Sequence, residues 1–551
     1  MIDRLKGISN WLRYTGLWLP PPVTVGIAVI MYYCYCPIDQ ILSVSMCVLL
    51  LSLVISLWIW SQNSIAKRNG LTEFPLIPYA TDQNPYYQVS YRAKALYKKP
   101  DKRLLYKEPK GIILGKSDGR YMSIQPGITP GALHTLVLGT SGSGKTSSVL
   151  LSTLLAQHNN KEITFLAVDV KGELLEKGFS PDDKVAVFNP RRRDLYGFDF
   201  LYDLTPKSTE SEVIEALRRV IYSLIPLRHT GGDEFWPIAA RTVLLGLFLF
   251  AWEYQQCYTL PQLVDFALSK NLNTLITDIL AEAEENSVVT RLLSPYGGDC
   301  VAEETLGSIS SNIGNALQLF SSDSNLRYLT READRKITPE LLEKGISIDL
   351  LIEDRDLEVY APILSLAVAT CITYLSSPAR EKAVAQDPLH SQVVFILDEL
   401  GRIPEVQGLP SILQIGRSRG CTVIGCLQSW SAAEDHYGEK VAQDMLTNFS
   451  YRVFLQCQPE SKDVEMAVKA FGKYTEKKKS VNTGKNKNYS YQFEEKDILQ
   501  ASDLLTLPDK NRIVVLSPFG AYMLTRCQYF KDTKLSKIAD HIRIERNHEE
   551  I

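Results

Sequence analysis

The sequence predicts an α/β fold in which a buried parallel sheet carries an inserted all-helical domain and follows an N-terminal anchor of two transmembrane helices. Three observations predict this arrangement. Short runs rich in Val, Ile and Leu alternate with helical segments over most of the chain, and this alternation stops between residues 204 and 334. The first 66 residues contain two long uncharged runs.

The two apolar runs near the N-terminus are each long enough to cross a bilayer. Residues 14–38 and 40–66 contain no charged side chain, and about 20 residues span the hydrocarbon core. Prolines at positions 20 to 22 make the first run the weaker candidate for a membrane helix, so a single transmembrane helix is the alternative interpretation. A cleaved signal peptide is disfavoured because the apolar stretch is too long and a second run follows at once. Residues 1–66 are therefore predicted to form a hairpin in the lipid bilayer.

The charges beside these runs predict the orientation of the hairpin. Arg4, Lys6 and Arg13 precede the first run, and Lys67 and Arg68 follow the second. Because basic residues favour the cytoplasmic side, both termini are expected there, with the chain passing the membrane more than once. Cysteines beyond the anchor lack metal-ligand or CxxC spacing, which is typical of a reducing compartment.

The rest of the chain divides by its pattern of apolar residues. Residues 67–110 are predicted to be a polar juxtamembrane connector, 111–203 and 335–551 the sheet domain, and 204–334 the all-α insertion. Strands are predicted at residues 111–115, 121–124, 134–139, 163–170, 184–189, 345–351, 393–399, 421–428, 451–457 and 512–517.

Two segments beyond the predicted anchor allow more than one structural interpretation. Residues 235–252 are apolar enough to be weighed as a third membrane span, but Pro237 and Arg241 near their start favour a buried core helix. Residues 472–492 are rich in Lys, Asn and Gly and contain few apolar side chains, so they are predicted to be a mobile loop.

The charge balance limits the kinds of partner. The 551 residues include 60 Lys and Arg against 63 Asp and Glu, a formal net charge of −3. Because no global basic field indicates nucleic acid, any contact with DNA must be local. The Lys-rich stretch 472–492 and Arg191, Arg192 and Arg193 are candidate phosphate contacts, although such groups more often form a solvated surface.

A glycine-rich stretch between a predicted strand and a predicted helix indicates a nucleotide site. GTSGSGKT at residues 139–146 fits G-x-x-x-x-G-K-[ST], a loop whose backbone amides surround phosphates at a helix N-terminus. Lys145 should contact the β- and γ-phosphates of ATP, and Thr146 should ligate Mg²⁺. The predicted nucleotide-binding residues are Gly139, Thr140, Ser141, Gly142, Ser143, Gly144, Lys145, Thr146 and Ser147.

An acidic pair is predicted to supply the second half of the site. The apolar strand at 393–399 ends in Asp398 and Glu399, at the sheet edge where α/β proteins bind ligands. Asp398 would hold Mg²⁺, and Glu399 would orient or deprotonate the attacking water. A catalytic glutamate beside the Mg²⁺ ligand suits water as nucleophile, so the pair predicts an ATPase rather than a kinase.

Two downstream groups complete the predicted site. Gln428 ends the strand at 421–428, the expected neighbour of the Asp398 strand, where its amide could place water or sense the γ-phosphate. Arg417 and Arg419 lie on the connection between these strands, from which an arginine could reach a phosphate of an adjacent subunit, although either arginine alone more often forms a surface salt bridge. The candidate catalytic residues are Lys145, Glu399, Gln428 and Arg417, and the candidate metal ligands are Thr146 and Asp398.

Together with the anchor and the P-loop, several longer motifs occur in one consistent order. They include VDVKGEL (168–174), DEFWPIAAR (233–241), LDELGRIPEV (397–406) and LQSWSAAEDHYG (427–438). The chain resembles the coupling proteins of type IV secretion and conjugation systems, the TraG/TraD/TrwB type. That resemblance implies a RecA-like P-loop ATPase domain, assembled as a homohexamer on the cytoplasmic face of the bacterial inner membrane, with ATP and Mg²⁺ as cofactors.

The resemblance also implies partners. A coupling protein of this kind hands single-stranded DNA with its bound relaxase, or protein effectors, to the inner-membrane components of a type IV secretion channel, and ATP hydrolysis drives the transfer. Cargo that is mainly protein, and a membrane-anchored DNA translocase of the FtsK/HerA kind, remain alternatives. So does a docking scaffold with a vestigial nucleotide site. The isolated chain could be a monomer that forms hexamers only on DNA or in the membrane.

Residue by residue, the resemblance assigns roles that agree with the chemistry above. Lys145 and Thr146 match the family's P-loop, Asp398 and Glu399 its acidic motif, and Gln428 its glutamine motif. Arg417 matches a trans-acting arginine. Relatives can place a second arginine just before the histidine that opens the P-loop strand, but Leu133 precedes His134 here, which leaves Arg417 as the better candidate.

Overall fold

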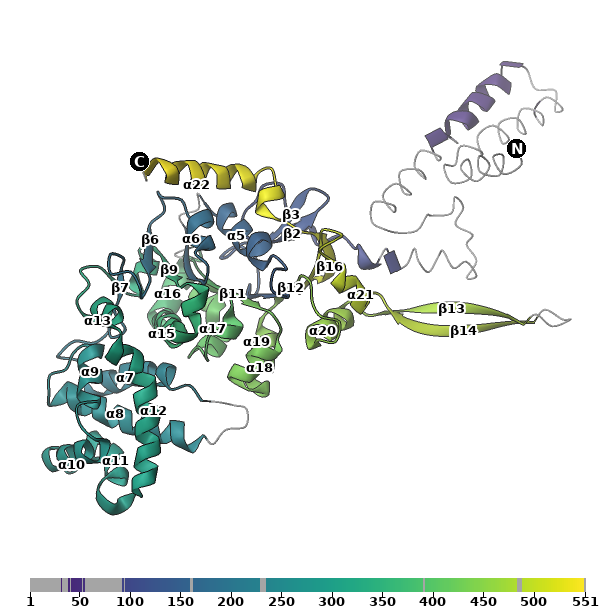
Figure 1. The fold of residues 1–551 in the computed structure, drawn as a ribbon. Coiled ribbons are helices and arrows are strands. Elements are labelled where there is room, and N and C mark those ends of the chain that lie inside the picture. Colours follow the sequence, from purple (N-terminus) through teal and green to yellow (C-terminus); the bar gives the residue numbers. More distant parts are fainter. Residues whose placement is uncertain are drawn as a thin grey trace. The chain divides into compact units, whose positions relative to one another are not determined.

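The computed structural model of this protein describes residues 31, 38–39, 41–51, 53–54, 92–93, 95–158, 162–227, 234–389, 392–482 and 488–549. The chain forms two compact units. One consists of Met1–Lys98 and Phe471–Leu499, and the other of Lys99–Ala470 and Gln500–Ile551. The second unit contains the large sheet and the helices around it (Figure 1).

Twelve strands of the described chain form one mixed sheet in the second unit. Every strand predicted from the sequence is part of it. In spatial order the strands are β1 (Leu105–Tyr106), β3 (Arg120–Ile124), β2 (Ile112–Ser117), β16 (Gly520–Thr525), β15 (Arg512–Ser517), β12 (Tyr451–Phe454), β4 (Thr135–Leu138), β11 (Cys421–Leu427), β10 (Gln392–Leu397), β5 (Ile163–Asp169), β9 (Ser347–Leu351) and β6 (Val185–Phe188).

The strands from β12 to β6 are all parallel, as their continuous apolar runs predict. The prediction that β15 joins them in parallel is wrong, because β15 pairs antiparallel with both β12 and β16. Ser517 and Gly520 face each other across the short turn between β15 and β16, and so tight a turn can join only antiparallel strands.

Helices cover both faces of this sheet, which confirms the predicted α/β fold. On one side α5 (Leu151–Ala156), α6 (Glu173–Gly178) and α22 (Leu535–Glu549) pack against one another, and on the other lie α15 (Leu357–Leu375) and α17 (Leu409–Ile415) (Figure 1). The remaining helices around the sheet are α14 (Glu340–Glu343), α16 (Pro378–Gln386), α18 (Ser431–Tyr437), α19 (Glu439–Asn448), α20 (Lys462–Phe471) and α21 (Ala501–Leu505).

The chain between β6 and β9 is mostly helical, as predicted. It leaves and returns through the paired short strands β7 (Gly197–Phe198) and β8 (Lys336–Ile337). The helices between them are α7 (Glu210–Leu224), α8 (Phe235–Glu253), α9 (Leu260–Ala267), α10 (Leu272–Glu282), α11 (Val288–Leu293), α12 (Glu303–Ser322) and α13 (Ser324–Arg331). Helix α8 contacts α7, α9, α11 and α12, so it is the core of this group (Figure 1).

The long apolar helices of the described chain are core helices. Phe235–Glu253 and Asp354–Leu375 are long and apolar enough to cross a membrane, yet 72% of the apolar window of each is buried inside the protein. Arg241 illustrates the burial of α8, because its guanidinium donates to the carbonyls of Ile225 (2.7 Å) and Tyr222 (3.3 Å) at the end of α7.

The predicted membrane anchor falls mostly outside the described residues. Its described part contains the apolar helix Ile41–Leu51, in the first unit. Leu42, Met46 and Leu51 on this helix are 65%, 66% and 64% exposed. Side chains this apolar and this exposed are typical of a segment that meets lipid or another apolar surface.

The prediction of a loop at residues 472–492 is wrong. This segment contributes to an antiparallel hairpin of β13 (Lys473–Asn482) and β14 (Asn488–Asp497), in the first unit. The reason lies in the period of the sequence rather than in its polarity. Tyr489, Tyr491 and Phe493 alternate with polar residues, which is the two-residue period of a strand.

The arginines at 191 to 193, weighed as phosphate contacts, are engaged within the protein. Arg191 pairs with Asp356 (2.8 Å), Arg192 pairs with Asp194 (2.6 Å), and Arg193 donates to Asn325 (2.6 Å). A phosphate would have to compete with these internal partners, and contact of this segment with DNA stays a prediction.

A buried carboxyl group in β9 is expected to make the stability of the folded chain depend on pH. Asp349 is fully buried, pairs in register with Ala167 and Val187, and neither of its oxygens has a hydrogen-bond partner among the described residues. Burial, and secondarily the nearby Asp169, raise the pKa of Asp349 well above its ordinary value. The folded chain therefore keeps this carboxyl protonated at pH values where the unfolded chain ionises it.

We expect Asp349→Asn to gain stability relative to the wild type as pH rises from about 4 toward neutrality, because the wild type must retain a proton that unfolding releases. The folded-state pKa is raised, so the wild-type stability is fully present below about pH 4 and is lost as pH rises toward the folded pKa. Thermal melts of both forms between pH 4.5 and 8 measure this. Parallel pH profiles would contradict the prediction, and Asp435→Asn, on an exposed position of α18, serves as control.

Candidate nucleotide site

The P-loop follows β4 directly and opens a helix, as its sequence predicts. Thr146–Leu150 form a short π-helical turn that continues into α5. Gly142 and Gly144 adopt left-handed φ values of 73° and 81°, which residues with a Cβ rarely adopt. Gly139 lies so close to Ser143 that a Cβ would come within 2.6 Å of its hydroxyl. The glycines therefore permit the tight loop.

Lys145 folds back over this loop. Its side chain is buried, with 6% exposure, and Nζ donates to the carbonyl of Gly139 over 2.7 Å and to that of Thr140 over 3.4 Å. The hydroxyl of Ser143 is also buried in the loop and has no hydrogen-bond partner among the described residues. A buried hydroxyl without a partner is costly unless a ligand supplies one. The loop is thus chemically suited to an anion such as phosphate.

Asp398 faces the P-loop from the end of β10. The hydroxyl of Thr146 donates to its Oδ2 over 3.5 Å, and the side chain is buried. Burial raises the pKa of Asp398 to about 7, with a further increase from Glu399, while the Lys145 ammonium opposes the shift. Ionising this carboxyl calls for a nearby cation.

The donor set around Asp398 fits Mg²⁺. Thr146 and Asp398 present a hydroxyl and a carboxylate oxygen, which are hard ligands, and Mg²⁺ usually takes few protein ligands together with phosphates and waters. No group of three His, Cys, Asp or Glu side chains able to hold a metal ion occurs in the described part of the chain. A metal here would therefore depend on the phosphates of a bound nucleotide.

Glu399 and Gln428 lie together beside this centre. The amide Nε2 of Gln428 donates to Oε2 of Glu399 over 3.4 Å. Glu399 adopts the left-handed region, with φ 56° and ψ 37°, which is uncommon for a residue with a side chain and is held here by the turn into η6 (Leu400–Arg402). Gln428, the residue after β11, is exposed, so its amide can meet solvent or a ligand.

Asp169 is a third carboxylate near the site and is absent from the residues predicted above. It ends β5, next to β10, and accepts the backbone N–H groups of Leu174 (2.8 Å) and Leu175 (2.9 Å). Its charge contributes to the raised pKa of Asp398. The signal was present in the motif VDVKGEL, where Asp169 ends a strand in the same way as Asp398.

The two arginines of the GRSRG segment lie at the opposite sheet edge. They belong to η7 (Gly416–Arg419) at the amino end of β11, whereas the P-loop follows the carboxyl end of the parallel strand β4. The seven residues of β11 separate the two edges by about 20 Å. Arg419 is buried, pairs with Glu381 and donates to the carbonyl of Ser376, whereas Arg417 is exposed. Arg417 is therefore distant from the P-loop of its own chain.

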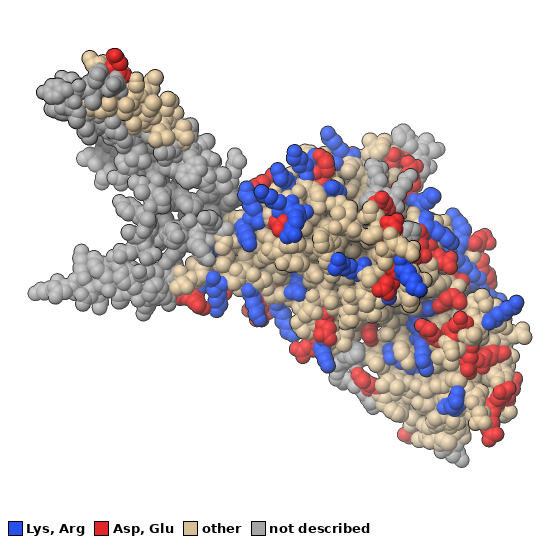
Figure 2. Space-filling view, turned by 180° about the vertical axis from the view of Figure 1, so that it is seen from behind, with Lys and Arg blue, Asp and Glu red and all other residues tan. Residues whose placement is uncertain are grey.

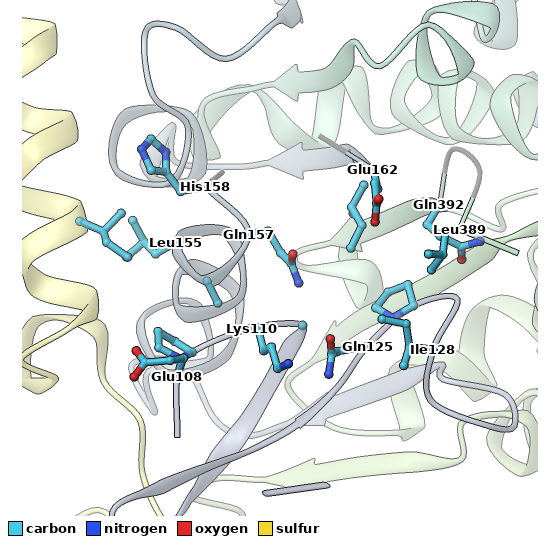
Figure 3. A pocket seen from close by; sticks show the side chains of 16 residues that line it. Glu108, Lys110, Gln125, Ile128, Leu155, Gln157, His158, Glu162, Leu389 and Gln392 are labelled. Carbon is cyan, nitrogen blue, oxygen red and sulfur yellow. The ribbon is translucent and has the colours of Figure 1, made fainter. Parts of the chain in front are cut away.

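A separate cavity of about 390 Å³ lies away from these residues (Figure 3). It is bounded by Ile163 and Gln392, which begin β5 and β10, so it lies at the amino ends of the parallel strands. Its polar lining comes from Glu108, Lys110, Gln125, Gln157, His158, Glu162 and Gln392 (Figure 3). The predicted site residues are not part of this lining.

The outer surface carries charges of both signs. On the face shown in Figure 2, Lys and Arg side chains are interspersed with Asp and Glu over the described residues. This mixture agrees with the near-neutral net charge of −3 and leaves no single-sign field over that face.

Known proteins share both the sequence pattern and the fold. The chain is 24% identical over 456 residues to the coupling protein TraD of Escherichia coli (strain K12), which covers 77% of this chain. The chain spans 57% of the length of that relative.

Solved structures of the conjugative coupling protein TrwB have a similar fold. An unbound form lacking its first 70 residues matches with a TM-score of 0.58 and 19% identity, covering 77% of this chain and 89% of that one. TrwB in complex with ADP and Mg²⁺ matches with a TM-score of 0.57 and 19% identity, covering 77% and 90%. This similarity confirms the RecA-like P-loop α/β fold.

A family model described as type IV secretory system conjugative DNA transfer matches residues 92–548. The match extends from just before the sheet into the last helix, α22, and includes the P-loop, the acidic pair and the helical insertion. This chain therefore belongs to the family of conjugative DNA transfer proteins of type IV secretory systems.

Proposed function

We propose that this protein is an ATPase of the coupling-protein kind that uses ATP hydrolysis to drive single-stranded DNA, with its bound relaxase, into a type IV secretion channel. The observation that carries the proposal is the meeting of three segments distant in sequence: Lys145 and Thr146 in the P-loop, Asp398 and Glu399 after β10, and Gln428 after β11. Nucleotide and Mg²⁺ binding by TrwB, a protein of the same fold, supports the cofactors.

Each residue has a distinct part in the proposed reaction. Backbone N–H groups of residues 139–147 and the Lys145 ammonium bind the phosphates, and Thr146 with Asp398 would hold Mg²⁺. When bound there, Mg²⁺ would supply positive charge that offsets the charge of the phosphates. Glu399 accepts the proton of the attacking water at a carboxylate oxygen, and Gln428 orients that carboxylate through its 3.4 Å hydrogen bond.

The assembly we propose is the one that the resemblance to coupling proteins implies. Residues 1–66 anchor the protein in the inner membrane as a hairpin with both termini cytoplasmic, and 67–110 connect the anchor to the motor. Residues 111–203 and 335–551 are the motor domain, and 204–334 the all-α domain that faces the substrate. The motor acts as a homohexamer, in which Arg417 of one subunit reaches the nucleotide of the next.

The function is tested by the ATPase activity of the full chain in detergent or lipid nanodiscs, with and without single-stranded DNA. We expect DNA to stimulate hydrolysis, with a binding affinity that falls as salt rises. A hydrolysis rate that DNA leaves unchanged but a secreted protein increases would instead support protein cargo. Hydrolysis stimulated only by duplex DNA would support a translocase of the FtsK/HerA kind.

Glu399→Gln should lower kcat by about 10²- to 10⁴-fold while ATP binding is retained, because the amide cannot accept the proton of water. Steady-state hydrolysis and equilibrium nucleotide binding measure the two effects. Asp435→Asn removes an exposed carboxylate of α18 and should match the wild type. An active Glu399→Gln enzyme would contradict the role assigned to Glu399.

Lys145→Ala should abolish conjugative transfer, because the P-loop loses the ammonium that contacts the phosphates. Transfer frequency in cells measures this, together with membrane insertion and oligomeric state of the variant. Lys440→Ala, at an exposed position of α19, is the control. Normal transfer by Lys145→Ala would instead identify the protein as a docking scaffold with a vestigial site.

Arg417→Ala should reduce hydrolysis by about 10³-fold if this arginine acts across subunits. Mixing Arg417→Ala with Lys145→Ala chains should restore part of the activity, because some interfaces then combine an intact P-loop with an intact arginine. Arg120→Ala, an exposed arginine of β3, is the control. Mixed hexamers without any recovery would contradict the trans role.

A further inference from the structure

Arg526 is a basic side chain beside the P-loop that no sequence motif indicated. Its guanidinium donates to the backbone carbonyl of Ser143 and, over 3.0 Å, to the hydroxyl of Ser148. These two residues flank positions 144–147, whose backbone amides face the phosphates in a loop of this kind. Arg526 therefore contacts the phosphate-binding loop on both sides of its functional segment.

The direction of β16 brings Arg526 to this edge of the sheet. Strand β15 is antiparallel to β12, and β16 is antiparallel to β15, so β16 runs in the direction of the parallel strands. Arg526 is the residue after β16, just as Gly139 is the residue after β4. A second bond fixes this segment, because Ser152 of α5 donates to the carbonyl of Cys527 over 2.7 Å.

The space and charge around Arg526 both point to a functional position. The guanidinium of Arg526 lies where a Cβ at position 144 would stand. The absence of a side chain at Gly144 therefore leaves room for Arg526, in addition to permitting the backbone φ of 81°. No carboxylate of the described residues pairs with Arg526. Burial without a counter-ion lowers its pKa below the ordinary arginine value. A partly buried cation without an acidic partner, placed against a phosphate-binding loop, is favoured by the arrival of phosphates.

We propose that Arg526 is a positioning residue of the nucleotide site that acts in cis. Its guanidinium holds the loop through Ser143 and Ser148, and its charge stabilises the phosphates of bound ADP and ATP alike. The C-terminal β15–β16 hairpin thereby takes part in nucleotide binding. This inference rests on the proposed nucleotide-dependent function and extends it to a residue outside the motifs.

The test uses the full chain in detergent or nanodiscs and compares Arg526→Gln, Arg526→Lys and Arg512→Gln with the wild type. Arg512 carries the same charge on the paired strand β15, but its guanidinium donates to Thr525 (3.2 Å). Equilibrium binding is measured with Mg-ADP and with Mg-ATP in a Glu399→Gln background. Thermal melts without nucleotide report folding of each variant.

We expect Arg526→Gln to weaken the binding of both nucleotides by about tenfold or more, because charge-assisted contacts to the loop and its ligand are lost. Arg526→Lys should be intermediate, since it keeps the charge and loses the two-pronged contact. In the hydrolytic enzyme, KM should rise with little change in kcat. Arg512→Gln should bind like the wild type.

The outcomes separate this inference from the proposed function. A lower melting temperature with unchanged Kd in Arg526→Gln would show a purely structural role and overturn the proposal. If that variant fails to fold, wild-type affinity in Arg526→Lys overturns it instead. A wild type that binds Mg-ADP without hydrolysing ATP would refute the proposed ATPase activity. The ratio of the variant Kd to the wild-type Kd would still decide the role of Arg526. A wild type that binds no nucleotide would overturn both.

Discussion

The parallel register of β4, β11 and β10 is the constraint on which the candidate site depends. Leu138 of β4 pairs with Leu427 of β11, and Gly425 of β11 pairs with Leu397 of β10. The three strands therefore end at the same edge, where the P-loop, Gln428 and the acidic pair begin. Every residue of these strands is buried, so a shift in register would disturb the core as well as the site.

Buried carboxyl groups lie on neighbouring strands at or near this edge. Asp398 follows β10, Asp169 ends β5, and Asp349 lies within β9, so three adjacent strands each contribute a buried carboxyl group. Burial raises the pKa of all three. Backbone N–H groups at the start of α6 favour the charged form of Asp169, and the Lys145 ammonium favours the charged form of Asp398. The oxygens of Asp349 have no hydrogen-bond partner among the described residues. A cation near this edge, such as the Lys145 ammonium, therefore favours the charged form of Asp398.

Much of the architecture could be predicted from the sequence because it depends on local patterns. Apolar runs identified the strands of the parallel core, and the helical period identified the insertion. The antiparallel direction of β15 could not be predicted, because it depends on a turn to β16, a strand that the pattern did not reveal. The hairpin of β13 and β14 was missed because its lysines outweighed the alternation of its aromatic residues.

The sequence by itself determined the chemistry available to this protein. The loop conformation at Gly142 and Gly144, the lysine and hydroxyl that follow, and the acidic pair after an apolar strand are local features, set by backbone freedom and by residue type. Only the tertiary structure decided which groups meet. Thr146 and Asp398 are 252 residues apart in sequence, and Arg526 and Ser143 are 383 apart. Such contacts depend on strand order and direction, which arise from the packing of the whole sheet rather than from any short segment.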